Sequence, residues 1–157
     1  MKKIFALAVA VLLSQTLLFA QTGKTVQEKN VPERYVKDFN KNADSPKNVQ
    51  WTLIDSMVYE AHYTSGSDNE CAIRFSPKGL EKRYYIDSRY YPHSIMDSIS
   101  ANHPGYKVKE LYILEIKNKS TYQVLIGKRK GLFVKKWRNM RYMNFETDGK
   151  FIDEIEL

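Results

Sequence analysis

The feature that most constrains the fold is a pattern that occurs twice along the chain. Each copy begins with a proline, and apolar residues follow at the third, fourth and seventh positions after it, which together make one face of a helix. The pattern predicts helices over residues 32–42 and 92–102. The apolar residues are Tyr35, Val36 and Phe39 after Pro32, and Ile95, Met96 and Ile99 after Pro92.

Each predicted helix is followed by four short runs rich in β-branched and aromatic residues, with turn residues between them. One such unit, at about 60 residues, would bury little surface by itself. We therefore expect an α+β fold of two tandem repeats, over residues 31–87 and 91–157, each a helix plus a four-stranded antiparallel meander. Together they would form an approximately eight-stranded sheet with both helices on one face. Trp51 is expected in the core beneath the first helix, with Val49 and Leu53 beside it.

The first twenty residues, MKKIFALAVAVLLSQTLLFA, have two lysines, an apolar run and a terminal alanine, as secretory signal peptides do. We expect cleavage after Ala20, a periplasmic or secreted protein, and no transmembrane segment after cleavage. Residues 21–30 are polar and predict a flexible or extended leader. The folded domain would then cover residues 31–157.

A basic stretch, KRKGLFVKKWRNMRY, covers residues 128–142. Without Lys2 and Lys3, 23 cations face 18 acids in the whole chain, and seven of those cations lie in this stretch. Cations interleaved with aromatic rings are typical of nucleic-acid binding, but export excludes that partner. The stretch therefore predicts either an anionic envelope partner or an acidic protein surface, or else a solvated hairpin edge. The candidate binding residues here are Lys128, Arg129, Lys130, Phe133, Lys135, Lys136, Trp137, Arg138 and Arg141; we expect the hairpin to project from the sheet with Trp137 partly exposed.

No catalytic or metal-binding constellation is evident in the sequence. His62, His93 and His103 do not have the spacing of a zinc site, and the chain has no nucleophile or phosphate-loop motif. The single cysteine, Cys71, alternates with apolar residues and predicts a core thiol. We expect no catalytic residues, no metal and no cofactor.

Four short motifs resemble, in their order, the PepSY-like, β-lactamase-inhibitor-like family of Gram-negative envelope proteins. They are the Val31-Pro32 helix start, PKNVQW at 46–51, HPGYKV at 103–108 and NFETDGKFIDE at 144–154. The resemblance covers nearly all of residues 31–157. It implies the tandem architecture and an open sheet face of the kind with which inhibitors clamp an enzyme. The basic stretch departs from the family pattern, as an insertion between the second and third strands of the second unit.

These observations favour a non-enzymatic binding or inhibitor-like module that recognises a protein or an anionic envelope partner. An envelope structural or stress component that binds a surface polymer or lipid is the alternative, and an enzyme of unrecognised type is a third. The predicted uncovered face of the sheet adds further candidate binding residues, which alternate with core positions along their strands. They are Glu60, His62, Arg74, Gln123 and Asn144.

Overall fold

The computed structural model describes residues 23–130 and 136–157. Over these residues the chain forms one antiparallel sheet of nine strands, in which each strand pairs with the next one along the chain. Two α-helices accompany the sheet, α1 (Glu33–Asn42) before β2 and α2 (His93–Asn102) before β6. The strands are β1 (Lys24–Val26), β2 (Lys47–Asp55), β3 (Val58–Thr64), β4 (Glu70–Ser76), β5 (Gly79–Tyr85), β6 (Lys107–Ile116), β7 (Lys119–Lys130), β8 (Lys136–Phe145) and β9 (Phe151–Glu156).

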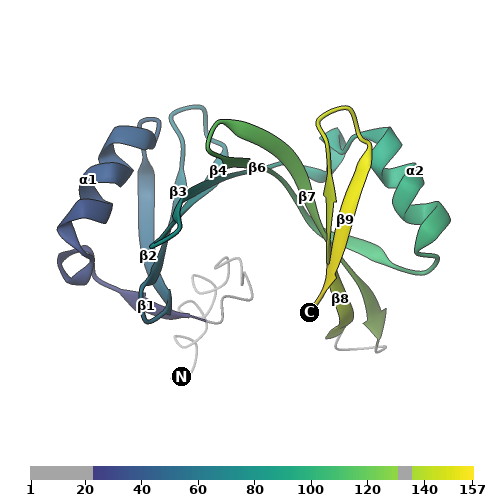
Figure 1. Cartoon of the computed structure of the whole chain (residues 1–157), viewed down its shortest axis with the longest axis horizontal. Coiled ribbons are helices and arrows are strands. Elements are labelled where there is room, and N and C mark those ends of the chain that lie inside the picture. Colours follow the sequence, from purple (N-terminus) through teal and green to yellow (C-terminus); the bar gives the residue numbers. More distant parts are fainter. Residues whose placement is uncertain (1–22, 131–135) are drawn as a thin grey trace, which may run out of the picture.

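The sheet is bent into an arch, with α1 and α2 on its outer, convex side at the two ends (Figure 1). The inner, concave side carries neither helix. Antiparallel sheets commonly pack one face and leave the other open, so the two faces are expected to differ in chemistry. Each helix is followed by four strands, as the sequence predicted; that the two halves repeat one unit stays a prediction.

Both helices begin and end close to their predicted limits. Pro32 and Pro92 lie immediately before the first helical residues, where their fixed φ suits a helix start and their missing N–H is no loss. Phe39 and Ile99, which occupy equivalent positions after the prolines, are both buried. The spacing of apolar residues after each proline therefore correctly predicted which face of each helix packs against the sheet.

Two separate hydrophobic clusters lie between the helices and the convex face. The first joins α1 to β2, β3 and β4 and is rich in aromatic rings, and the second joins α2 to β6, β7 and β8 and is mostly aliphatic. Trp51 is buried in the first cluster, as expected. The expectation for Val49 was wrong, because it is 38% exposed. An irregular pairing between Lys47 and Gln50, with Asn48 at a positive φ, interrupts the alternation of β2 just before Trp51.

The predicted eight-stranded sheet gains a ninth strand from the leader. The sequence predicted a flexible or extended leader over residues 21–30, and Lys24–Val26 is extended and pairs with β2 at the edge of the sheet. A 3-10 turn, Glu28–Asn30, follows it. The indole Nε1 of Trp51 lies 3.4 Å from Glu28 Oε2 and donates to it. Backbone pairing and this contact supply an order that the polar composition of the segment did not indicate.

The basic stretch forms part of a long β7–β8 hairpin. The family pattern has a short turn between these two strands. Here β7 continues to Lys130 and β8 begins at Lys136, and the two strands remain paired as far as these residues. A bulge with Asn139 at a φ of 50° interrupts the register of this pair. A Cβ at Gly127 would lie 3.1 Å from the Trp137 ring, so the glycine makes room for the indole. Trp137 is half-buried, in agreement with its predicted partial exposure.

Neither α-helix in residues 23–130 and 136–157 is long and apolar enough to cross a membrane.

Candidate functional site

The concave face carries a continuous band of polar side chains, which we call the polar row. Strand register places Glu60 of β3 opposite Arg74 of β4, and Arg74 opposite Glu81 of β5. In the second half of the sheet, Tyr112 of β6 lies opposite Gln123 of β7, and Gln123 opposite Asn144 of β8. Because side chains alternate between the faces of a strand, these residues all point to the concave side.

Glu60 is the centre of the first half of the polar row. Its carboxylate is only 3% exposed, and three side chains donate to it. His62 Nε2 lies 2.8 Å from Oε1, while Arg74 Nε lies 2.8 Å and Arg83 Nη1 3.1 Å from Oε2. We call Glu60, His62, Arg74 and Arg83 the ionic cluster. A buried carboxylate is tolerated only when it is paired in this way.

The ionic cluster keeps Glu60 ionised. Burial by itself raises the pKa of Glu60, but the hydrogen bond from His62 and the charges of Arg83 and Arg74 outweigh it and lower the pKa to about 2. A carboxylate of such low pKa, with its oxygens already engaged, is a poor general base at neutral pH. Its physical effect is to hold the two guanidinium groups in place on the concave face.

The second half of the polar row is a hydrogen-bonded chain across four strands. The Tyr112 hydroxyl donates to Gln123 Oε1, and Gln123 Nε2 donates to Asn144 Oδ1 over 2.8 Å. Asn144 Nδ2 in turn donates to Asp153 Oδ1 of β9 over 2.6 Å. Each amide accepts a hydrogen bond through its oxygen from one neighbour and donates one through its nitrogen to the other. These hydrogen bonds therefore fix the orientation of both amides.

Arg83 connects the two halves. Its guanidinium lies over the Tyr112 ring, 5.2 Å from the centroid, while Nη1 reaches Glu60. Burial raises the pKa of both Tyr112 and the neighbouring Tyr85, so these phenols stay neutral hydrogen-bonding groups. Among the described residues, the buried Nε of Arg83 has no hydrogen-bond partner. Arg83 thus sits where the ionic and the mostly uncharged halves of the row meet.

The polar row can bind a partner by hydrogen bonds and charge, and its groups are held in position before any partner arrives. In the part of the chain that the structure describes, no group of three or more histidine, cysteine or acidic side chains is placed to hold a metal ion. Cys71 is buried, and burial raises the pKa of its thiol. The expected core role of this thiol agrees with its place in the first hydrophobic cluster.

Five of the predicted binding residues come together on the concave face, and Asn144 is the fifth beside the four named next. Glu60, His62, Arg74 and Gln123 lie on the uncovered face, as expected. Their exposure differs, because the Glu60 side chain is 3% exposed and the His62 side chain is 14% exposed. The Glu60 carboxylate accepts from His62 on its own strand and from Arg74 and Arg83 on the next two strands, and these partners offset the cost of its burial. Arg74, at 29% exposure, remains accessible.

The basic stretch lies apart from the centre of the polar row, on the β7–β8 hairpin. Lys128, Arg129, Lys136 and Arg138 are exposed, and Arg129 lies over the Trp137 ring at 5.3 Å from the centroid. Lys130 is the last residue of β7 and pairs with Lys136. Phe133 and Lys135 are outside the described residues. Arg141 instead faces the convex side, where Nη1 lies 2.8 Å from Glu154 Oε1 and the guanidinium lies over the Tyr106 ring.

Sequence reasoning missed Arg83, Tyr85, Tyr112 and Asp153 as members of this face. In LEKRYYI, Glu81, Arg83 and Tyr85 alternate, and this spacing places them on the same side of a strand. That alternation could have identified the β5 contribution. The pairing of Tyr112 with Gln123 depends on strand register, which the sequence alone did not show.

Comparisons with known proteins place the fold. No protein-family model matches the chain, and no curated protein of similar sequence was found. A crystal structure of a BLIP-like protein from Bacteroides fragilis superposes with a TM-score of 0.58 at 15% sequence identity, covering 80% of this chain and 86% of that one. The fold is BLIP-like. The likeness supports the expected inhibitor-like architecture as a fold and does not extend to the PepSY-like family.

Proposed function

We propose that the protein is a non-enzymatic, inhibitor-like binding module, exported to the periplasm or beyond, that recognises a protein partner with the concave face of its sheet. The BLIP-like fold supports an inhibitor-like binding module. We choose this surface because hydrogen bonds within the protein already hold the side chains of the polar row in place. The row lies on the side of the arch that carries no α-helix (Figure 1). Ordering these side chains in advance lowers the entropic cost of association.

The concave face combines anchors of different kinds. Its centre offers the partly exposed guanidinium of Arg74 and the Gln123 and Asn144 amides, and Tyr142 lies beside them as a half-buried ring. Arginine and tyrosine are enriched among the residues that dominate protein–protein binding energy. A partner with a carboxylate or backbone carbonyl aimed at Arg74 would complement this centre.

A second candidate is recognition of an anionic envelope component, lipid or polymer, by the β7–β8 hairpin. It is favoured by a pocket of about 610 Å³ beside α2, lined by Lys107, Arg129, Trp137 and the apolar side chains of Met96 and Val108. Cations around apolar and aromatic surface suit an amphiphile with an anionic group. Such binding would weaken steeply with salt because exposed charges are screened.

Capture from envelope extract on the purified protein distinguishes the two candidates. A variant with Gln50→Arg and Ile155→Arg puts bulk and charge on two exposed concave positions at opposite ends of the sheet. The matched control, Asn40→Arg with Ser100→Arg, likewise adds two positive charges at exposed positions of the two outer helices. We expect one stoichiometric protein partner that the concave variant loses and the helix variant keeps.

A third variant tests the hairpin by replacing four exposed cations with glutamate. If it alone abolishes binding, and the wild type binds anionic vesicles or polysaccharide in a salt-sensitive manner, the second candidate is correct. If the concave variant keeps every partner of the wild type, the proposal for the concave face is refuted. The four replacements are Lys128→Glu, Arg129→Glu, Lys136→Glu and Arg138→Glu.

A further inference from the structure

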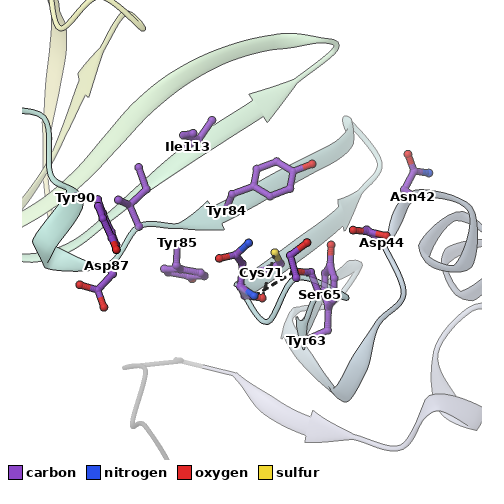
Figure 2. Close-up of a pocket in the computed structure, with 13 residues that line it drawn as sticks. Asn42, Asp44, Tyr63, Ser65, Cys71, Tyr84, Tyr85, Asp87, Tyr90 and Ile113 are labelled. Carbon is purple, nitrogen blue, oxygen red and sulfur yellow. Dashed lines mark hydrogen bonds between the residues drawn. The ribbon is translucent and has the colours of Figure 1, made fainter.

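A pocket of about 410 Å³ opens on the convex side, and Tyr85 is the residue of the concave face that also reaches its lining. It lies between the end of α1, the β3–β4 turn and the segment that joins β5 to α2 (Figure 2). Its floor includes Tyr63, Cys71 and Tyr84, which strand register places side by side on the convex face of three neighbouring strands. The pocket therefore occupies a part of the convex face that the two helices leave uncovered.

The lining has the chemistry of a site for a cation. It contains the rings of Tyr63, Tyr84 and Tyr90 and the carboxylates of Asp44 and Asp87. Among the described residues, no lysine or arginine lines it. Aromatic faces attract cations through their quadrupole, and carboxylates attract them through charge.

One end of the pocket already shows how the chain holds a cation there. Arg89 Nε lies 3.0 Å from Asp87 Oδ1 and Nη2 lies 3.1 Å from Oδ2, while the guanidinium lies over the Tyr90 ring at 5.7 Å from the centroid. At this end of the pocket, Arg89 of the protein itself therefore binds the Asp87 carboxylate and lies over the Tyr90 ring.

The other end has the same kinds of group, and no cationic side chain of residues 23–130 or 136–157 lines it. The side chains of Asp44, Tyr63 and Ser65 converge on the space beside the Tyr84 ring (Figure 2). In the described ranges no hydrogen bond or ion pair engages the Asp44 carboxylate, although its backbone carbonyl accepts from Gly66 N. Burial raises the pKa of Tyr63 and of Cys71, and the negative charge of Asp44 adds to both shifts. The negative electrostatic potential of Asp44 therefore extends into the pocket.

We propose that this pocket binds an organic ammonium group at the end of an alkyl chain, as carried by polyamines and by lysine side chains. The ammonium is held by Asp44 and the hydroxyls of Tyr63 and Ser65, and the alkyl chain lies against the Tyr84 ring. A volume of about 410 Å³ is within the range of small-molecule sites and accommodates a chain of several carbons. None of the four residues assigned to the ligand belongs to the polar row, so the proposal stands or falls separately from the proposed function.

Titration of the purified full-length protein with spermidine and with a blocked lysine peptide tests the proposal, read out by calorimetry and by NMR shifts of the pocket residues. We expect saturable binding at one site and no binding of 1,7-heptanediol, which has a chain of similar length without charge. Tighter binding of spermidine identifies a free polyamine as the ligand, and tighter binding of the peptide identifies a lysine of another protein.

Asp44→Asn should weaken the binding about fivefold or more, because it removes the charge that faces the ammonium. Asp97→Asn removes the same charge from an exposed position on α2 and should leave the affinity unchanged. Tyr84→Leu, which removes the ring but keeps an apolar side chain, should also weaken it. Absence of saturable binding of either ammonium by the wild type, or equal affinity of the wild type and Asp44→Asn, would overturn the proposal.

Discussion

The two halves of the sheet have the same order of elements and different cores. Beneath α1 the core is a set of touching rings: Phe39 meets Trp51 and Tyr63 edge to face, each at 5.3 Å between centroids. Beneath α2 the core is mainly aliphatic, with Ile95, Val124 and Ile126 fully buried. One arrangement of helix and strands therefore tolerates two kinds of packing, provided that each fills its own space.

The two halves also differ in the interactions that hold the side chains of the concave face. In the first half Glu60 holds Arg74 and Arg83 by charge, and in the second half Gln123 and Asn144 are held mainly by uncharged hydrogen bonds. Buried charges cost more to leave unpaired than amides do. The first half should therefore be the part of the protein that responds to pH and to loss of a single charge.

The largest expected effect is on the aromatic core. Trp51→Ala should lower the free energy of unfolding by about 5 kcal/mol, because it removes a large buried ring and leaves a cavity. Ile95→Ala, in the aliphatic core, should cost about 3 kcal/mol. Urea denaturation of both variants measures the difference. A larger loss for Ile95→Ala would show that the aliphatic cluster is the stronger of the two.

Glu60→Gln should cost about 4 kcal/mol, since it leaves the guanidinium groups of Arg74 and Arg83 close together without their counter-charge. Its counterpart in the second half, Gln123→Leu, should cost about 2 kcal/mol, because only uncharged hydrogen bonds are lost. The same denaturation measurement applies. Equal losses would remove the distinction between the ionic and the uncharged halves.

The pH dependence of stability should come from Glu60. Its pKa is about 2 in the folded protein against 4.5 for the free group, so ionisation stabilises the fold above pH 4.5, and the stabilisation is lost as the pH falls toward 2. A difference of this size is worth about 3 kcal/mol. Unfolding free energies measured from pH 6 to pH 2 should fall by about that amount more in the wild type than in Glu60→Gln. Parallel pH profiles for the two proteins would contradict the assignment.

The smallest expected effect is at the convex edge of the second half. Glu154 lies 2.8 Å from Arg141 and 3.0 Å from His103, with its side chain 35% exposed. Glu154→Gln should cost about 0.5 kcal/mol, because solvent screens such pairs. It should also keep the steep acid loss of stability of the wild type, and so serves as the control for Glu60→Gln. A loss comparable to that of Glu60→Gln would show that charge matters equally in both halves.

Much of the fold could be predicted from periodicity. The prolines and the spacing of Phe39 and Ile99 identified both helices, and alternation along the strands placed Glu60 and Arg74 on the face opposite the core. The ninth strand could not be predicted, because Lys24–Val26 is a short segment of a mostly polar leader and gains its order from pairing with β2. The exposure of Val49 was missed because an irregularity before Trp51 breaks the simple alternation.

The candidate site was only partly visible in the sequence. Glu60, His62, Arg74 and Gln123 were expected as candidate binding residues of the uncovered face, and the structure joins them through Arg83 and Tyr112. The pocket on the convex side was not predicted, since Asp44, Tyr63 and Tyr84 come from the end of α1 and from two different strands. Residues so far apart in the chain share a site only once strand register brings them together.

Local rules account for what the sequence alone determined: which segments are helix or strand, and which face of each is apolar. These depend on residue spacing within one element, where a period of 3.6 or 2 is set by backbone geometry. Register, curvature and the order of nine strands decided the rest, including the burial of Glu60 among two arginines and a histidine. That burial is decided by the tertiary structure, because His62 on the same strand is one partner of the carboxylate, and the two guanidinium groups that also offset its removal from water come from other strands.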